Sequence, residues 1–162
     1  MNALPLAQAR AALERCCGSQ RWVESMLARR PFADTLQLLA ASDAATAELG
    51  RDDLLEAFSH HPPIGMDLEA LRRKFAGTAA LSAAEQAAAA SADRATLEAL
   101  RDKNGLYLQR FGYIFIVCAS GKSAAEMLAL LEQRLCNPPD LELGIAAAEQ
   151  GKITKLRLEK LA

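Results

Sequence analysis

The chain is poor in residues that bind metals or crosslink a protein. Its 162 residues include two histidines and four cysteines. No C-x-x-C or cysteine–histidine spacing typical of a zinc site occurs, and the adjacent pair Cys16-Cys17 does not fit a disulfide framework. We therefore expect no metal site, and free buried thiols in a reducing compartment.

Neither positive nor negative charge is in clear excess, and the sequence contains no long apolar run. The 19 Lys and Arg residues balance 20 Asp and Glu residues, for a net charge of −1. Without surplus positive charge, neither nucleic acid nor an anionic membrane is an expected partner. No stretch approaches the roughly 18 apolar residues of a transmembrane helix, and Arg10 and Glu14 interrupt any signal-like run. The sequence predicts a soluble, cytoplasmic protein.

Aromatic residues make up only 5% of the chain, whereas 51% is hydrophobic and rich in Ala and Leu, which are strong helix formers. A chain of this length fits one domain. We therefore predict an all-α, single-domain bundle of about eight helices over residues 1–162. The expected helices cover residues 5–16, 20–30, 35–49, 54–61, 68–77, 83–111, 124–135 and 141–161.

Two of these helices raise specific questions. An interruption at Asn104-Gly105 is the open alternative for the helix over 83–111. The final helix is expected to turn four apolar side chains inward, namely Ile145, Ile153, Leu156 and Leu158.

Residues 113–120, "YIFIVCAS", favour a strand by local propensity. A single strand has no partner in a helical chain, so its backbone either stays extended and bonds to other groups or becomes helical. We expect a buried apolar segment with a partly irregular backbone.

The stretch "SHHPPIG" contains both histidines, immediately before Pro62 and Pro63. Two prolines cannot continue a helix, so His61 is expected at a helix end, in a rigid turn. Histidine exchanges protons near neutral pH, which makes His61 a candidate acid or base. The alternative is a helix stop with no chemical role.

Three other candidates have structural alternatives. "SGKS" at 120–123 resembles the end of a phosphate-binding loop, but Ile116 occupies the position of the required glycine, so a helix cap at Ser123 explains it better. Ser82 and Glu85 have capping-box spacing. Arg157 could be a solvated cation on the last helix.

Four separated motifs nevertheless occur in one order, and together they are specific. They are "HHPPIG", "LSAAEQ", "NGLYLQRFGYIFIVCASGKSAAEMLALLEQRL" and "ITKLRL". Over about residues 25–160 the chain resembles the OHCU decarboxylase family, which acts on 2-oxo-4-hydroxy-4-carboxy-5-ureidoimidazoline (OHCU) in urate breakdown. The family carries an acidic or basic residue after His-Pro in many members, whereas this chain has Pro63.

The resemblance implies an all-α homodimer that converts OHCU to (S)-allantoin and carbon dioxide without a cofactor. His61 and Glu85 would be catalytic, and pairing with Glu85 would raise the pKa of His61. Arg157 would face the negative charge of the substrate. The other residues implied to bind this small molecule are Pro62, Ser82, Gln86, Phe115, Ile116, Val117, Cys118 and Ala119.

Two alternatives stay open at this point. A related enzyme could keep the pocket and act on another ureide. A catalytically silent helical interaction module would have no reason to bring His61, Glu85, Gln86 and Arg157 together around one cavity.

Overall fold

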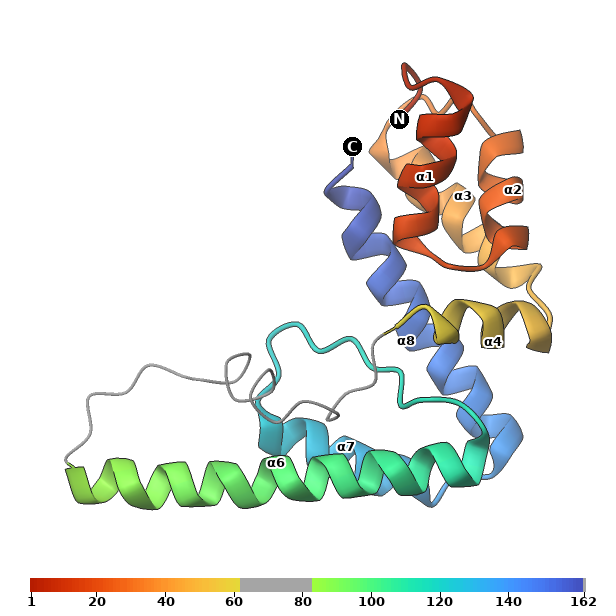
Figure 1. The fold of residues 1–162 in the computed structure, drawn as a ribbon. Helices are drawn as coiled ribbons and strands as arrows, with labels where there is room; N and C mark the ends of the chain where they lie inside the picture. The colour runs from red at the N-terminus through yellow and green to blue at the C-terminus, as the bar shows by residue number, and fades with distance from the viewer. Residues whose placement is uncertain (62–82, 162) are drawn as a thin grey trace. The chain divides into compact units, whose positions relative to one another are not determined.

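The computed structural model describes residues 1–61 and 83–161, and only the backbone of residues 83–93. These residues form seven helices and no strand (Figure 1), so the predicted all-α class is confirmed. The helices are α1 (Leu6–Cys16), α2 (Gln20–Ala28), α3 (Thr35–Ala47), α4 (Arg51–Ser59), α6 (Ala83–Phe111), α7 (Ala124–Leu135) and α8 (Pro139–Glu159). The helix predicted over 68–77 lies outside the described residues.

Side-chain caps set several of the helix starts. The Asp34 carboxylate accepts the Gln37 N–H at 2.7 Å, and the Ser123 hydroxyl accepts the Glu126 N–H at 3.3 Å while Glu126 accepts the Ser123 N–H at 2.7 Å. Ser123 is thus a helix cap, as expected. Helix α4 begins earlier than predicted, because Asp53 lies inside its first turn and accepts the N–H of Gly50 at 2.9 Å.

Helix α6 is continuous through Asn104-Gly105, so the open alternative of an interruption is wrong. The Asn104 side chain donates to the Leu100 carbonyl at 2.8 Å and stays within the helix. Gly112 ends it, with a φ of 79° and an N–H that bonds to the Leu108 carbonyl at 2.9 Å.

The chain divides into two compact units, and α8 contributes to both. Unit 1 comprises residues 1–61, 116–118 and 143–162, and unit 2 comprises 62–115 and 119–142. Whether they act as one domain, as the sequence predicts, stays a prediction. In unit 1, helices α1, α2 and α3 pack in succession (Figure 1) around a core that includes Leu13, Trp22, Met26 and Leu158.

Unit 2 packs α6 against α7 and contains a buried polar cluster. The Glu142 carboxylate is fully buried and pairs with Arg134 at 2.6 Å, while the Tyr107 hydroxyl and the Asn137 amide also bond to it. The Arg134 guanidinium lies 4.6 Å from the centre of the Phe115 ring. Because each buried charge has a partner, this cluster is consistent with a structural role.

The buried face of α8 differs from the prediction. Leu158 is buried as expected, but Leu156 is 38% exposed, and Ile145 and Ile153 are only partly buried. Besides Leu158, the residues buried in the unit 1 part of α8 are Ala146, Gln150 and Thr154. The prediction followed the spacing of apolar residues, whereas two of the buried positions, Gln150 and Thr154, hold polar side chains.

Three of the four free cysteines are buried, as expected, but Cys136 is exposed, which corrects that part of the prediction. Burial raises the pKa of the Cys16 thiol to about 11, so this sulfur is a poor nucleophile.

Within the described residues, no helix combines the length and apolar character needed to cross a membrane.

Candidate functional site

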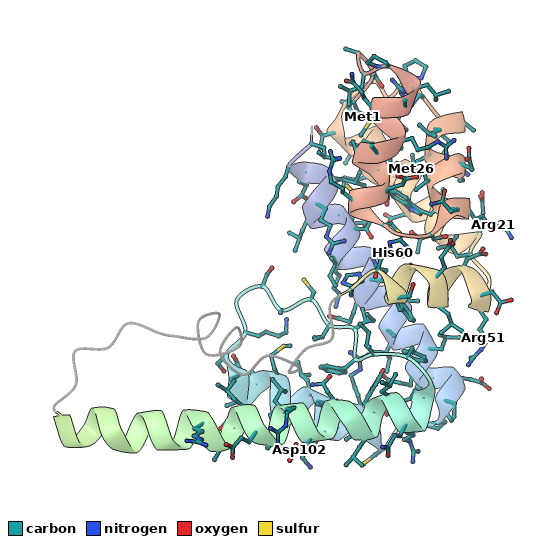
Figure 2. The ribbon with its side chains drawn as sticks, in the orientation of Figure 1. Met1, Arg21, Met26, Arg51, His60 and Asp102 are labelled. Atoms are coloured by element: carbon teal, nitrogen blue, oxygen red, sulfur yellow. The ribbon has the colours of Figure 1, made fainter. Side chains whose placement is uncertain are left out.

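His61 lies just beyond the end of α4, where the sequence predicts it. The helix ends at Ser59, and the N–H of His61 bonds to the Phe58 carbonyl at 3.1 Å. Figure 2 shows the neighbouring His60 at this end of α4. His61 is partly buried, whereas His60 is exposed. The end of α4 thus positions the backbone of His61, and the side chain is partly buried.

The surroundings of His61 favour its neutral form. Burial lowers the pKa of its imidazole, and the positive charge of Arg157 and the charge of His60 lower it further. Among the residues whose side chains the structure describes, an interaction with Gln150 acts in the opposite direction. The described surroundings therefore favour the neutral, proton-accepting form of His61 near pH 7. The predicted upward effect of Glu85 is untested, because that side chain is not described.

Arg157 is more than a solvated cation on α8. Its Nη1 donates to the carbonyls of Arg15 at 3.2 Å and Cys16 at 3.1 Å, which are the last carbonyls of α1. Carbonyls at a helix C-terminus lack helical partners and attract cations. These bonds anchor the guanidinium, and among the described residues no partner takes its other N–H groups. They can therefore bind an anion.

An open cavity of about 480 Å³ lies next to this arginine in unit 1. Its lining includes His60 rather than His61. The residues lining it are Ala11, Glu14, Arg15, Gly18, Gln20, His60 and Arg157. The structure therefore makes both histidines candidates to be compared by experiment.

Gly18, in the turn between α1 and α2, approaches His60 closely. A Cβ atom added to Gly18 would lie 2.6 Å from the Cβ of His60, so a side chain here would push the end of α4 away. Only glycine allows α4 to end at this place.

Replacing Gly18 by alanine is expected to lower the free energy of unfolding by about 1–3 kcal/mol, the usual cost of overpacking. Urea unfolding measures it. The matched control is Gly105→Ala in α6, where an added Cβ meets nothing within 4 Å. That change is expected to stabilise the protein by roughly 0.5–1 kcal/mol, because alanine favours helix. Equal effects of both substitutions would contradict the close approach.

The segment predicted to line the substrate has an irregular backbone. Ile116, Val117 and Cys118 are buried and belong to unit 1, and the Cys118 N–H donates to the Glu149 carboxylate of α8 at 2.7 Å. The alternative in which other groups bond an extended backbone is therefore correct at Cys118. The Glu149 carboxylate thus already accepts the Cys118 N–H. The sequence did not indicate this hydrogen bond.

Phe115 and Ala119, the two ends of this segment, belong to unit 2. The Phe115 ring packs on Tyr107, with their centres 5.3 Å apart. Ala119 begins a turn in which its carbonyl accepts the Lys122 N–H at 3.2 Å. In this structure Phe115 is a packing residue of unit 2.

Gln150 is a residue of this region that the sequence reasoning missed. It is 2% exposed, and its Nε2 donates to the Thr154 hydroxyl at 3.1 Å. Thr154 in turn lies 3.5 Å from the Cys16 carbonyl, which Arg157 also contacts. The four-residue spacing of Gln150 and Thr154 was the available signal, but neither residue type suggested a buried face.

The remaining predicted residues cannot be placed. Pro62 and Ser82 lie outside the described residues, and Glu85 and Gln86 are seen only as backbone in α6. No cluster of three potential metal ligands occurs among the side chains that are described.

Comparison with known proteins identifies the family. Residues 2–159 match the family model described as OHCU decarboxylase. The chain is 41% identical over 148 residues to the uric acid degradation bifunctional protein TTL of Arabidopsis thaliana, covering 90% of this chain and 45% of that protein. It is 29% identical to a 2-oxo-4-hydroxy-4-carboxy-5-ureidoimidazoline decarboxylase of Haloferax volcanii, covering 85% and 79% of the two chains.

Solved structures agree with this match. A crystal structure of OHCU decarboxylase in the presence of (S)-allantoin aligns with a TM-score of 0.73 and 37% identity, covering 91% of this chain and 94% of that one. A crystal structure of (S)-allantoin synthase shares the fold, with a TM-score of 0.68, 23% identity, and coverage of 98% and 51%. The resemblance expected from the motifs is confirmed, and the chain belongs to the OHCU decarboxylase family.

Proposed function

We propose that this chain decarboxylates OHCU, giving (S)-allantoin and carbon dioxide in urate breakdown. Membership of the OHCU decarboxylase family supports the substrate class. The observation that carries the proposal is that unit 1 contains both a partly buried His61 at the end of α4 and an Arg157 guanidinium anchored at the end of α1, and that burial and this cation lower the pKa of the histidine. This pair joins a proton acceptor to an anion-binding group in one unit.

The reaction requires proton transfers and a group that binds the negative charge of the substrate. Loss of carbon dioxide from the carbon that carries the hydroxyl and the carboxylate leaves an electron pair, which the ring takes up, and a proton from solvent neutralises the ring. Neutral His61 accepts the hydroxyl proton as this C–OH becomes a carbonyl, and returns it to the neighbouring ring carbon from one face, giving neutral allantoin as a single enantiomer. Such positioned proton transfer typically contributes about 10²- to 10⁴-fold in rate.

Arg157 binds the anionic substrate in this proposal. Its planar guanidinium can hold two oxygens at once, and the bonds to the end of α1 keep it in place. The substrate ring is itself the electron sink, so the proposed chemistry uses no cofactor. The charge of Arg157 also keeps His61 in the neutral form that accepts a proton.

Other roles are proposed from the family resemblance. Glu85 acts with His61 in proton transfer, Ser82 and Gln86 donate or accept neutral hydrogen bonds, and Pro62 borders the histidine. Residues 115–119 contribute their backbone to the substrate edge, through groups other than the Cys118 N–H.

The quaternary structure is proposed from the same resemblance, and the location from the free cysteines. We propose a cytoplasmic homodimer. Light scattering after size-exclusion chromatography should give twice the mass of one 17.4 kDa chain. A monomer would contradict this proposal.

Circular dichroism tests the activity directly. OHCU is generated from urate by the two preceding enzyme activities, and the protein is then added. A fast rise in the optical signal of (S)-allantoin is expected, since uncatalysed decay gives a racemate with no net signal. No acceleration by folded protein would contradict the proposal and direct attention to other ureides, and then to the silent interaction module.

A further inference from the structure

The side chain of Gln150 has an orientation that its neighbours determine. A threonine hydroxyl has one proton to donate, and the Thr154 hydroxyl donates it to the Cys16 carbonyl at 3.5 Å. Toward Gln150, Thr154 can therefore only accept a hydrogen bond. The NH₂ group of the Gln150 amide must face Thr154, which it does at 3.1 Å, so its oxygen must face the other way.

This amide oxygen is buried without a good donor. Gln150 is 2% exposed, and Oε1 makes no hydrogen bond of acceptable geometry to any residue that the structure describes. An unpaired buried carbonyl is costly, about 1–3 kcal/mol, so a group that approaches it is expected. The His61 imidazole is such a group, because interaction with the Gln150 side chain favours its charged form. His61 and Gln150 both belong to unit 1.

The hydrogen-bonded chain ends on a rigid element. The Cys16 carbonyl belongs to the last residue of α1, and it accepts from both Thr154 and Arg157. The end of α1 therefore holds both the residue that orients Gln150 and the cation proposed to bind substrate. Gln150 and Thr154 are buried on α8, where apolar side chains would cost less free energy to bury. Their presence is explained if they position another group.

We propose that Gln150 is a positioning residue for His61: its amide oxygen, oriented by Thr154, accepts one imidazole N–H and leaves the other ring nitrogen unprotonated to act as the base. This inference deepens the proposed function and rests on it. Among the described residues, the charged and titratable groups that act on His61 are Arg157 of α8 and His60 of its own turn, and the Arg157 guanidinium has no acceptor for a hydrogen bond. Gln150 supplies the acceptor.

Two substitutions of Gln150 separate this role from a packing role. Gln150→Met keeps the volume and removes the acceptor, so the pKa of His61 should fall. Gln150→Glu puts a carboxylate in its place, so the pKa of His61 should rise. Thr154→Val frees the amide to rotate and should shift the pKa in the same direction as Gln150→Met, by less. The matched control is Gln133→Met, at an exposed glutamine of α7.

Nuclear magnetic resonance of ¹⁵N-labelled imidazoles measures the pKa and the tautomer of His61 without substrate. One tautomer is expected in the wild type and a mixture in Gln150→Met. With OHCU, Gln150→Met should lower kcat about tenfold, the effect of losing one hydrogen bond to a group that becomes charged, with little change in KM. Gln133→Met should change none of these values.

The outcomes distinguish the two proposals. If the tautomer and pKa of His61 are unchanged in both Gln150 variants, the positioning role is overturned, whatever the activity. If they change as expected but the wild type does not act on OHCU, the pairing stands and the proposed function fails. Equal losses of kcat in both variants, with an unmoved pKa and only a lower melting temperature, would assign Gln150 to packing.

Discussion

Replacing His61 by glutamine is expected to lower kcat for OHCU by about 10²- to 10⁴-fold, the range lost with a positioned proton carrier. Glutamine has polar atoms at a similar reach but cannot exchange a proton near pH 7. The production of optically active allantoin should fall with kcat, because face-selective protonation is lost. Circular dichroism follows both quantities in one assay, and far-ultraviolet spectra check that the variant is folded.

His60→Gln is the matched comparison for this prediction. His60 is exposed and lines the cavity beside Arg157, whereas His61 is partly buried. We expect His60→Gln to reduce kcat by less than roughly tenfold, since no proton transfer depends on it. A large loss in His60→Gln with a small one in His61→Gln would reverse the assignment and make His60 the proton carrier.

The wild-type pH profile follows from the same residue. The pKa of His61 lies below its ordinary value of about 6.5, so the neutral base persists into mildly acidic solution. The value of kcat/KM should therefore fall on the acid side with a midpoint below about 6.5.

The free energy of unfolding should also decrease as the pH falls. As pH falls from about 6.5, the unfolded chain binds a proton at His61 before the folded chain does, so the free energy of unfolding decreases.

Replacing Arg157 by glutamine is expected to lower kcat/KM for OHCU by about 10²-fold, mostly through a higher KM. The reason is that the charge-assisted hydrogen bonds to the anionic substrate are lost. The same change should raise the pKa of His61, since the Arg157 cation now lowers it. The acid limb of the profile should thus move to higher pH. Steady-state kinetics across pH and titration of His61 by magnetic resonance measure the two effects.

Lys155→Gln is the control for charge on α8. Lys155 is two residues from Arg157 and pairs with Asp43 of α3 at 2.7 Å. Removing it should leave KM and the pKa of His61 unchanged within error. If Lys155→Gln and Arg157→Gln raise KM equally, the role of Arg157 is general attraction of an anion rather than direct binding.

Helix type and most helix ends were predictable because their causes are local. Proline, glycine and capping side chains act within one turn, as Asp34, Ser123 and Gly112 show. The start of α4 was predicted late because an aspartate can cap either from before the helix or from its first turn, as Asp53 does. Local sequence does not distinguish these two uses of a carboxylate.

The site was predictable only in part. The motif order identified the family and named His61 and Arg157, both of which lie in unit 1, where the Arg157 cation lowers the pKa of His61. Gln150 was missed because periodicity of apolar residues cannot reveal a buried face that carries polar groups. The role proposed for Gln150 depends on Thr154 and on the Cys16 carbonyl, and Cys16 and Thr154 are 138 residues apart in the chain.

The sequence by itself determined the helical class, the helix-ending turn at His61, and the family, since each rests on residue type and order. Only the tertiary structure decided that the end of α1 holds Arg157, that burial and this cation lower the pKa of His61, and that Gly18 must have no side chain. Local propensities act over one turn, whereas desolvation, charge and close approach depend on which distant segments pack together.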